Sequence, residues 1–287
     1  ILHTTTPWPN AAATSLAAKE MGIPWIYEVR GEPEATWAAY QPTESHPEST
    51  EYFRLSRSKE EEAMRAAAGV VALSETSAAS LRSRGIQGPI VVAPNAVAPD
   101  WASKRIPADQ ARRQLGLEPK RYVGAVSSIV EYEGFDDLIL ALHHLSQDVA
   151  VLLVGDGTHL PVLRDLVERE GLSGRVTFTG RQPAYSIAPY YSALDVFVAP
   201  RRDSLVTRTV TPMKTLQAHA FGIPIVASDL PALREVTRGQ AQYVPPGNPE
   251  GLAAAISAAL QEQAVTPPQL PSWADVARVY RELYAGV

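Results

Sequence analysis

Four basic residues lie within one short segment of the chain, residues 196–229, between two apolar runs. Arg201 and Arg202 follow the first apolar run directly, and Arg208 and Lys214 come next. Guanidinium and ammonium groups form charge-assisted hydrogen bonds with phosphate oxygens, and these are stronger than neutral hydrogen bonds. The grouping of these cations therefore predicts an anion-binding site, and a diphosphate suits its charge.

The same segment carries the signals of a helix start. Thr211 and Pro212 are typical of an N-cap followed by proline at the first helical position, and Gly222 is typical of a helix end. Unpaired backbone N–H groups and the positive end of the helix dipole would then face the crevice at the strand ends. Solvated loop arginines and a helix start without a ligand would produce the same pattern. Evidence from the rest of the chain is therefore needed to distinguish an anion site from these alternatives.

Length and composition exclude several classes of protein. The chain has 287 residues, which suits two domains that each bury a core. Its formal net charge of -5 and the lack of a long Lys/Arg block argue against a general nucleic-acid binder, because such binding needs a basic face. The absence of cysteine excludes a disulfide framework, thiol catalysis and cysteine-ligated zinc. No apolar run reaches the roughly 20 residues that a membrane-spanning helix needs.

Apolar runs alternate with helical patterns along the chain, which predicts an α/β fold with parallel sheets. We expect about four strands before a proline-containing connection at residues 98–120. Six more strands are expected at residues 122–127, 149–154, 176–179, 196–199, 223–227 and 242–244. Residues 31–50 show no clear period and are expected to form a loop, and residues 262–271 a linker to a last helix at 272–285.

The first half of the chain is expected to lack part of its sheet. Ile1, Leu2 and His3 are already strand-like, and a sheet that began there would expose an unpaired hydrophobic edge. From the usual size of such domains, we expect that roughly a hundred residues of the native first domain are missing.

Seven short motifs occur in order along almost the whole chain. They are Val91-Val92-Ala93-Pro94-Asn95-Ala96-Val97, Val123-Gly124, Leu153-Val154-Gly155-Asp156-Gly157, Val176-Thr177-Phe178-Thr179-Gly180-Arg181, the stretch from Pro212 to Val226, Pro245-Pro246-Gly247-Asn248-Pro249, and Ser272-Trp273. In this order they resemble the motifs of the retaining glycosyltransferases of family 4. Tyr27-Glu28-Val29-Arg30-Gly31 and Val210-Thr211-Pro212-Met213-Lys214 resemble the branch found with exopolysaccharide and exosortase gene systems.

The resemblance implies the GT-B fold, with two Rossmann-like doubly wound domains that face a cleft. It implies a truncated amino-terminal, acceptor-side domain at residues 1–98 and a nucleotide-sugar-binding domain at residues 99–271. The terminal helix, residues 272–287, is expected to pack back on the first domain.

The chain departs from the family pattern at four positions of the donor site. Family members usually have Arg and Lys in the loop after the first strand of the second domain, where this chain has Ser128 and Glu133. They also usually have two glutamates eight positions apart, where this chain has Thr209 and Gln217. An amide can still accept one hydrogen bond and donate two, so Gln217 is a candidate ligand for the ribose. Arg202, Arg208 and Lys214 would then replace the missing cations.

These considerations give a predicted set of site residues. Arg202 and Lys214 are expected to stabilise the leaving diphosphate as its charge develops. The donor is expected to be bound by Ser127, Ser128, Gly180, Arg181, Arg208, Thr209, Thr211 and Gln217. Arg30 and Glu28 are expected on the acceptor or donor-sugar side, and a salt bridge explains this pair equally well. Trp8 and Trp37 are candidates for stacking on a sugar ring, although core packing explains them as well.

The resemblance implies a metal-independent, hexosyltransferase-like enzyme without a cofactor, whose diphosphate oxygen itself takes the acceptor's proton. It implies a nucleotide-diphosphate sugar as donor and a glycan or lipid-linked glycan as acceptor, used in cell-surface polysaccharide synthesis. The expected location is the cytoplasm, at the inner face of the membrane if the missing amino-terminal part makes a peripheral contact. Two alternatives stay open: a homologue with a degenerate donor site that acts as a binding subunit, and another GT-B enzyme such as a sugar-nucleotide epimerase. The truncation predicts poor turnover by this chain.

Overall fold

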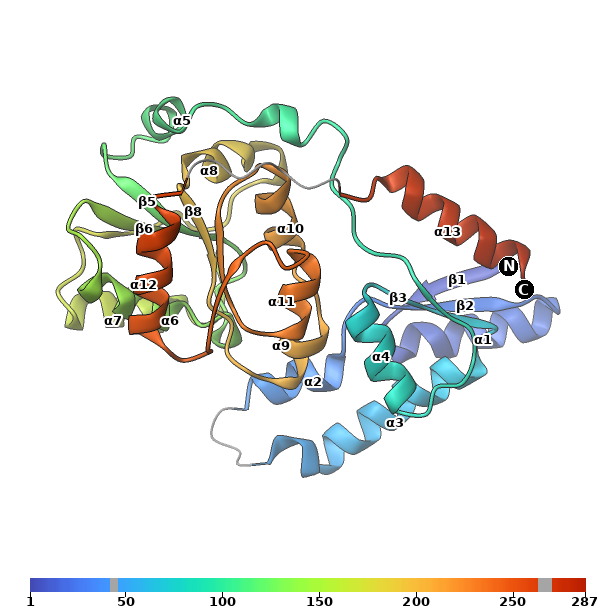
Figure 1. Cartoon of the computed structure of the whole chain (residues 1–287). Helices are drawn as coiled ribbons and strands as arrows, with labels where there is room; N and C mark the ends of the chain where they lie inside the picture. Colours follow the sequence, from blue (N-terminus) through green and yellow to red (C-terminus); the bar gives the residue numbers. More distant parts are fainter. Residues whose placement is uncertain (42–45, 263–269) are drawn as a thin grey trace. The chain divides into compact units, whose positions relative to one another are not determined.

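The computed structural model describes residues 1–41, 46–262 and 270–287 and shows two compact units (Figure 1). The first unit consists of Ile1–Ala96, Ser204–Thr211 and Pro271–Val287. The second consists of Val97–Asp203 and Pro212–Leu270. Most of the expected linker at residues 262–271, and part of the expected loop at residues 31–50, lie outside the described residues.

The first unit is built on a parallel sheet of four strands in the order β1-β2-β3-β4. The strands are β1 (Leu2–Thr5), β2 (Trp25–Val29), β3 (Gly69–Ala72) and β4 (Ile90–Val92). The helices are α1 (Trp8–Met21), α2 (Pro33–Ala39), α3 (Glu51–Ala66), α4 (Glu75–Ser83), α9 (Leu205–Thr209) and α13 (Trp273–Ala285).

Strand β2 is buried along its whole length because helices cover both faces of this sheet. Trp25 and Tyr27 pack into one core with residues of α1, α3 and α4. Ile26 points to the opposite face and packs with Val276 and Leu283 of α13. The alternation of side chains along a strand thus places neighbouring residues in two separate cores.

Part of the segment expected to be a loop is helical. Residues 33–39 form α2, with proline in its first turn and Glu32 at the N-cap position. The expectation of an irregular stretch from residue 31 to residue 50 was therefore wrong for this part. A helix of seven residues spans only two turns, which is too short for its periodicity to appear in the sequence.

The second unit is built on a parallel sheet of six strands, the number that the sequence predicted, and the structure places them in the order β10-β9-β8-β5-β6-β7. The strands are β5 (Arg121–Val126), β6 (Val149–Val154), β7 (Val176–Phe178), β8 (Val196–Ala199), β9 (Ile225–Ser228) and β10 (Gln242–Val244). The helices are α5 (Ala108–Gln114), α6 (Phe135–Ala141), α7 (Leu160–Arg169), α8 (Ala188–Ala193), α10 (Met213–Ala220), α11 (Pro231–Val236) and α12 (Pro249–Ala259).

The order of the six strands reverses next to β5. The chain runs outward from β5 through β6 to β7, and then returns to place β8 on the other side of β5. All six residues of β6 are buried, and a single continuous core surrounds these strands. In open parallel sheets, ligands bind beyond the carboxyl ends of the strands at such a reversal. Within the described residues, no helix is long and apolar enough to span a membrane.

Candidate functional site

A pocket of about 930 Å³ opens in the second unit beyond the carboxyl ends of β5 and β6. Its walls come from four places: the loop after β5, the loop after β6, the loop after β7 and helix α10. The polar residues among its lining are Ser127, Ser128, Asp156, Thr158, Arg181, Gln182, Lys214 and Gln217. A volume of this size is typical of a site for a small organic ligand.

Glycines allow the loops after β5 and β6 to touch. A Cβ atom on Gly155 would lie 1.8 Å from the carbonyl oxygen of Ser127, and one on Gly157 would lie 2.2 Å from that of Ile129. The backbone N–H of Ile129 donates to the Asp156 carbonyl at 2.9 Å, which joins the two loops. The motif from residue 153 to residue 157, noted in the sequence for its resemblance, therefore shapes the floor of the pocket.

Two side chains of α10 line the pocket, and they differ in how firmly they are held. The Gln217 Oε1 atom accepts a hydrogen bond from the Tyr191 hydroxyl at 2.9 Å. Tyr191 is fully buried, so this bond fixes the orientation of the amide and leaves its NH₂ group for other partners. Lys214 is exposed and its side chain makes no hydrogen bond or ion pair among the residues that the structure describes.

Helix α10 starts differently from the expected helix. Pro212 is the N-cap residue, not the first helical residue, and no side chain caps the helix. The expectation that Thr211 caps this helix was therefore wrong. Thr211 belongs to a stretch, Ser204–Thr211, that clusters with the first unit and contains the short helix α9. Ser204 and Thr207 form a capping box at the start of α9, a signal that the sequence contained.

The two arginines after β8 are bound to carboxylates of the second unit. Arg201 is buried and forms a two-pronged ion pair with Glu133, with Arg201 Nη2 2.7 Å from Oε1 and Arg201 Nε 3.2 Å from Oε2. Arg202 pairs with Glu131 at 2.7 Å and with Asp136 at 2.9 Å. Neither arginine lines the pocket.

The ion pairs of Arg202 continue toward the loop after β6. Asp136, at the start of α6, also contacts His159 at 2.8 Å between Oδ1 and Nε2. The backbone N–H of His159 donates to the Ile129 carbonyl at 3.0 Å. Arg202 is thus part of a chain of contacts that holds the loops beside the pocket together.

The structure gathers some of the predicted donor residues and separates others. Ser127, Ser128, Arg181, Lys214 and Gln217 line the one pocket. Gly180 is not among the lining residues, but its carbonyl accepts a hydrogen bond from the backbone N–H of Gly155, which does line the pocket, at 3.0 Å. Arg202 is engaged with Glu131 and Asp136 instead. Arg208, Thr209 and Thr211 belong to the first unit. The sequence analysis did not name Asp156 and Gln182, which also line the pocket, or Tyr191, which contacts Gln217, although the glycines around Asp156 could have pointed to a ligand loop.

The pair predicted for the acceptor side lies in the first unit. Glu28, on β2, is buried and contacts Arg30 at 2.6 Å and His3 at 3.1 Å. Burial opposes ionisation of Glu28, but the hydrogen bonds and charges of His3 and Arg30 outweigh it and lower the pKa of Glu28. Glu28 and Arg30 therefore form the salt bridge that the sequence left open.

The two predicted sugar-stacking tryptophans also lie in the first unit. Trp8 lines an apolar groove of about 150 Å³ between α1 and α3. Trp37 packs against Tyr52, with 4.6 Å between the ring centroids. No three His, Cys, Asp or Glu side chains of the described residues converge as metal ligands.

Family models match most of the chain. A model described as Glycosyl transferase 4-like domain matches residues 1–96, and one described as Glycosyl transferases group 1 matches residues 120–262. The chain is 34% identical over 139 residues to the lipopolysaccharide core biosynthesis mannosyltransferase LpsB of Rhizobium meliloti, covering 45% of this chain and 38% of that protein. It is 32% identical over 121 residues to a GDP-mannose-dependent phosphatidylinositol monomannoside mannosyltransferase of Mycolicibacterium smegmatis, covering 40% and 32%. The matches thus span well under half of either relative.

Solved structures share the fold over nearly the whole chain. Sucrose-phosphate synthase from Thermosynechococcus elongatus matches with a TM-score of 0.80 and 23% identity, covering 99% of this chain and 74% of that one. HepE of Anabaena in complex with UDP and glucose matches with a TM-score of 0.75 and 19% identity, covering 99% and 77%. WaaG, a glycosyltransferase involved in lipopolysaccharide biosynthesis, matches with a TM-score of 0.69 and 17% identity, covering 98% and 81%. Both halves of the chain match glycosyltransferase models and the whole matches these folds, so the chain belongs to the glycosyltransferases with the GT-B fold.

Proposed function

We propose that this protein is a retaining glycosyltransferase that moves a sugar from a nucleotide-diphosphate sugar to a glycan or lipid-linked glycan. The observation that carries the proposal is the pocket at the carboxyl ends of β5 and β6, where Lys214 is exposed and the Gln217 amide is held by Tyr191. The names of the relatives support a role in cell-surface polysaccharide synthesis, since one acts in lipopolysaccharide core biosynthesis. The motifs at residues 27–31 and 210–214 favour the exosortase-associated branch.

The diphosphate of the donor is assigned to the wall formed by α10. Lys214 supplies a positive charge there, and no side chain caps the start of α10 and no acidic residue lies in its first turn, so the positive end of the helix dipole is not offset. Arg181, exposed on the opposite loop, supplies a second cation in the same pocket. Preorganised cations of this kind stabilise the leaving diphosphate as its charge develops during transfer.

The ribose is assigned to Gln217. Its Oε1 atom already accepts from the Tyr191 hydroxyl, so the NH₂ group is the part that can donate to a ribose hydroxyl. The Trp101 indole N–H donates to the Gln217 backbone carbonyl at 3.0 Å and holds the same turn of α10. The proposed mechanism needs neither a metal nor a side-chain base, because the leaving diphosphate oxygen takes the proton of the acceptor.

A second candidate function is a binding subunit that has lost transfer activity. It is favoured by the residues at the two positions where relatives carry diphosphate cations. Ser128 is neutral, and Glu133 is a carboxylate that is fully engaged with Arg201. Binding of a nucleoside diphosphate without sugar transfer would support this candidate over the enzyme.

Calorimetric titration with a nucleoside and its diphosphate, using uridine with UDP and guanosine with GDP, tests the proposal. Lys214→Ala should weaken binding of the diphosphate by about 1.5–3 kcal/mol and leave binding of the nucleoside unchanged, because the ammonium group contacts only phosphate. Gln217→Leu should weaken nucleoside and diphosphate alike by about 1–3 kcal/mol, because it removes a ribose ligand.

Lys120→Ala is the matched control, because Lys120 lies at the amino end of β5, away from the pocket. It should leave both affinities unchanged. If neither UDP nor GDP binds the unaltered protein, the pocket is not a donor site. If a nucleotide binds, sugar transfer is measured with UDP-sugars and GDP-mannose to separate the enzyme from the binding subunit.

A further inference from the structure

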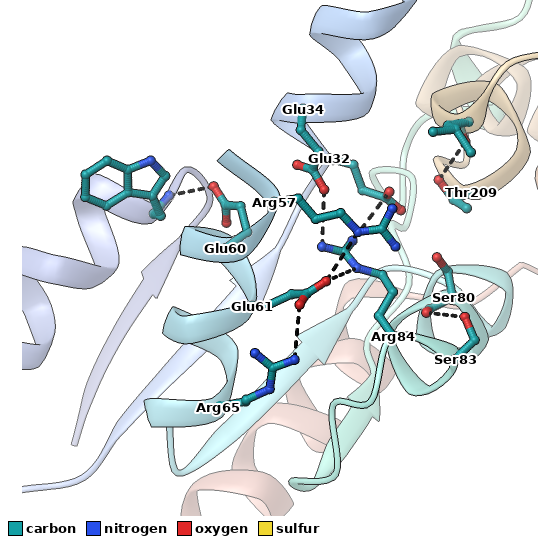
Figure 2. Close-up of polar contacts among 12 residues, drawn as sticks. Glu32, Glu34, Arg57, Glu60, Glu61, Arg65, Ser80, Ser83, Arg84 and Thr209 are labelled. Carbon is teal, nitrogen blue, oxygen red and sulfur yellow. Dashed lines mark hydrogen bonds and ion pairs between the residues drawn. The ribbon is translucent and has the colours of Figure 1, made fainter. Parts of the chain in front are cut away.

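Three carboxylates of the first unit surround one buried guanidinium group (Figure 2). The Arg84 side chain, which is only 4% exposed, lies 3.6 Å from Glu32, 3.2 Å from Glu34 and 3.0 Å from Glu61. Arg57 reaches Glu61 at 3.3 Å from a more exposed position. Glu32 and Glu34 belong to the start of α2, Glu61 to α3, and Arg84 to the end of α4.

Two carboxylate oxygens of this cluster are not satisfied. Glu32 Oε1 and Glu34 Oε2 are buried and have no hydrogen-bond partner among the described residues. A buried ionised oxygen without a partner is costly, and the cost falls when the group takes up a proton. The cluster therefore favours a proton on a carboxylate, and the proton needs an acceptor.

Thr209 offers that acceptor. Its side chain lines the same small pocket as Glu32, with Ser74 and Ser77 at the start of α4. The Thr209 hydroxyl donates its own hydrogen to the Leu205 carbonyl at 3.1 Å, so its oxygen can still accept a hydrogen bond. Figure 2 shows Glu32 and Thr209 on neighbouring elements, α2 and α9.

We propose that Glu32 is a positioning residue that holds α9 through its protonated carboxyl group, with Oε1 donating to the Thr209 hydroxyl oxygen. Helix α9 packs against α2 and α4, and the chain passes from Thr211 directly to Pro212, the N-cap of α10. A role for this contact in donor binding rests on the proposed function, because α10 carries the residues assigned to the donor. The contact itself is tested without any ligand.

The surroundings of Glu32 support a retained proton. Burial is the largest influence and raises the pKa of Glu32, and the negative charge of Glu34 acts in the same direction. The positive charges of Arg84 and Arg57 oppose this rise but do not cancel it. Two further arginines are near in the chain: Arg208 of α9 is exposed, and Arg30 is paired with Glu28.

The sign of the pH effect follows from the raised pKa. Below the pKa of a glutamic acid in the unfolded chain, Glu32 is protonated in both states and its full contribution to stability is present. As the pH rises through the higher pKa of the folded state, the proton leaves and the bond to Thr209 is lost. Helix α9 should therefore become less firmly held as the pH rises.

Amide hydrogen exchange of the full chain, without nucleotide, tests the proposal between about pH 5 and pH 9, after correction for intrinsic exchange rates. The probes are the backbone N–H groups of Arg208 and Val210, which donate to the Ser204 and Val206 carbonyls of α9. Their protection should fall about fivefold as Glu32 ionises, which is the loss of one ordinary hydrogen bond.

Variants separate this effect from general loosening. Glu32→Gln should keep α9 protected at every pH, because its amide donates to Thr209 without titrating. Thr209→Val should lower protection at low pH and abolish the pH dependence. Glu34→Gln should move the transition to lower pH, because it removes the negative charge that raises the pKa of Glu32. Glu62→Gln, at an exposed position of α3, is the matched control and should behave like the unaltered chain.

Protection of α9 that does not depend on pH would overturn the proposal, as would a Glu32→Gln variant that loosens α9 at all pH values. Neither result bears on the proposed function, because the titrations with UDP and GDP measure the pocket of the second unit. If nucleotide does not bind but the protection of α9 still depends on pH as expected, the proposed function is wrong and the contact between Glu32 and Thr209 is supported.

Discussion

Four cations of the second unit fall into two groups, and the comparison shows what decides whether a cation is available to a ligand. Arg201 and Arg202 are paired with carboxylates from residues 131–136. Lys214 and Arg181 project from the pocket wall and make no ion pair among the described residues. All four follow strands of the same sheet. Carboxylates brought close by the fold, and not the position of the cation along the chain, therefore separate the two groups.

The largest effect is expected from breaking the most buried pair of the first group. Glu133→Ala should lower the free energy of unfolding by about 3 kcal/mol, near the lower end for a broken buried ion pair, because Arg201 keeps a further interaction. Chemical denaturation measures this change. Glu118→Ala is the control, since Glu118 is exposed and pairs with Lys120 on the surface, and it should leave the denaturation midpoint in place. If the two variants are equally stable, the stability of the fold does not depend on the pair of Arg201 and Glu133.

The sequence predicted the sheets better than the site, for a physical reason. Strands β6, β8 and β9 of the second unit are buried along their whole length, so they appear as continuous apolar runs such as residues 149–154. Helices α2 and α9 have seven and five residues, too few to show a period, and α9 is held by residues of α2 and α4 that are far away in the sequence.

The pocket was predicted in part. Lys214 and Gln217 were found because a helix start beyond a strand end is a local pattern that the sequence displays. The partners of Arg202 were not found, because Glu131 and Asp136 lie 71 and 66 positions away and meet it only through the fold. The acidic stretch at residues 131–137 follows the neighbouring strand β5, and this was the signal available in the sequence.

A smaller effect should sharpen the contrast between Arg202 and Lys214. Arg202→Ala should change the affinities for a nucleoside and its diphosphate by the same factor, within roughly threefold, because this half-exposed arginine holds loops and contacts no phosphate. Titration with uridine and UDP measures both. A selective loss of UDP affinity, like that expected for Lys214→Ala, would move Arg202 into the group that binds the ligand.

The smallest effect concerns Arg30, the cation of the first unit that pairs with Glu28. Arg30 is half exposed, so this pair is weaker than the buried pair of Arg201, and we expect it to contribute less than about 1 kcal/mol. Because His3 and Arg30 lower the pKa of Glu28 in the folded protein, the contribution is present above the pKa of an unfolded glutamic acid and is lost as the pH falls through the lower value.

Glu28→Gln should therefore make the loss of stability in acid shallower, and it should leave the alkaline side unchanged. Glu32→Gln, which replaces a carboxyl group of raised pKa, should act with the opposite sign, on the loss of stability as the pH rises. Denaturation curves at a series of pH values separate the two variants. If Glu28→Gln leaves the acid side as steep as in the unaltered chain, the pair with Arg30 holds no stability. Arg30 would then be a cation available to a ligand, as Lys214 is. In that case, proximity to a carboxylate would not by itself make a cation unavailable to a ligand.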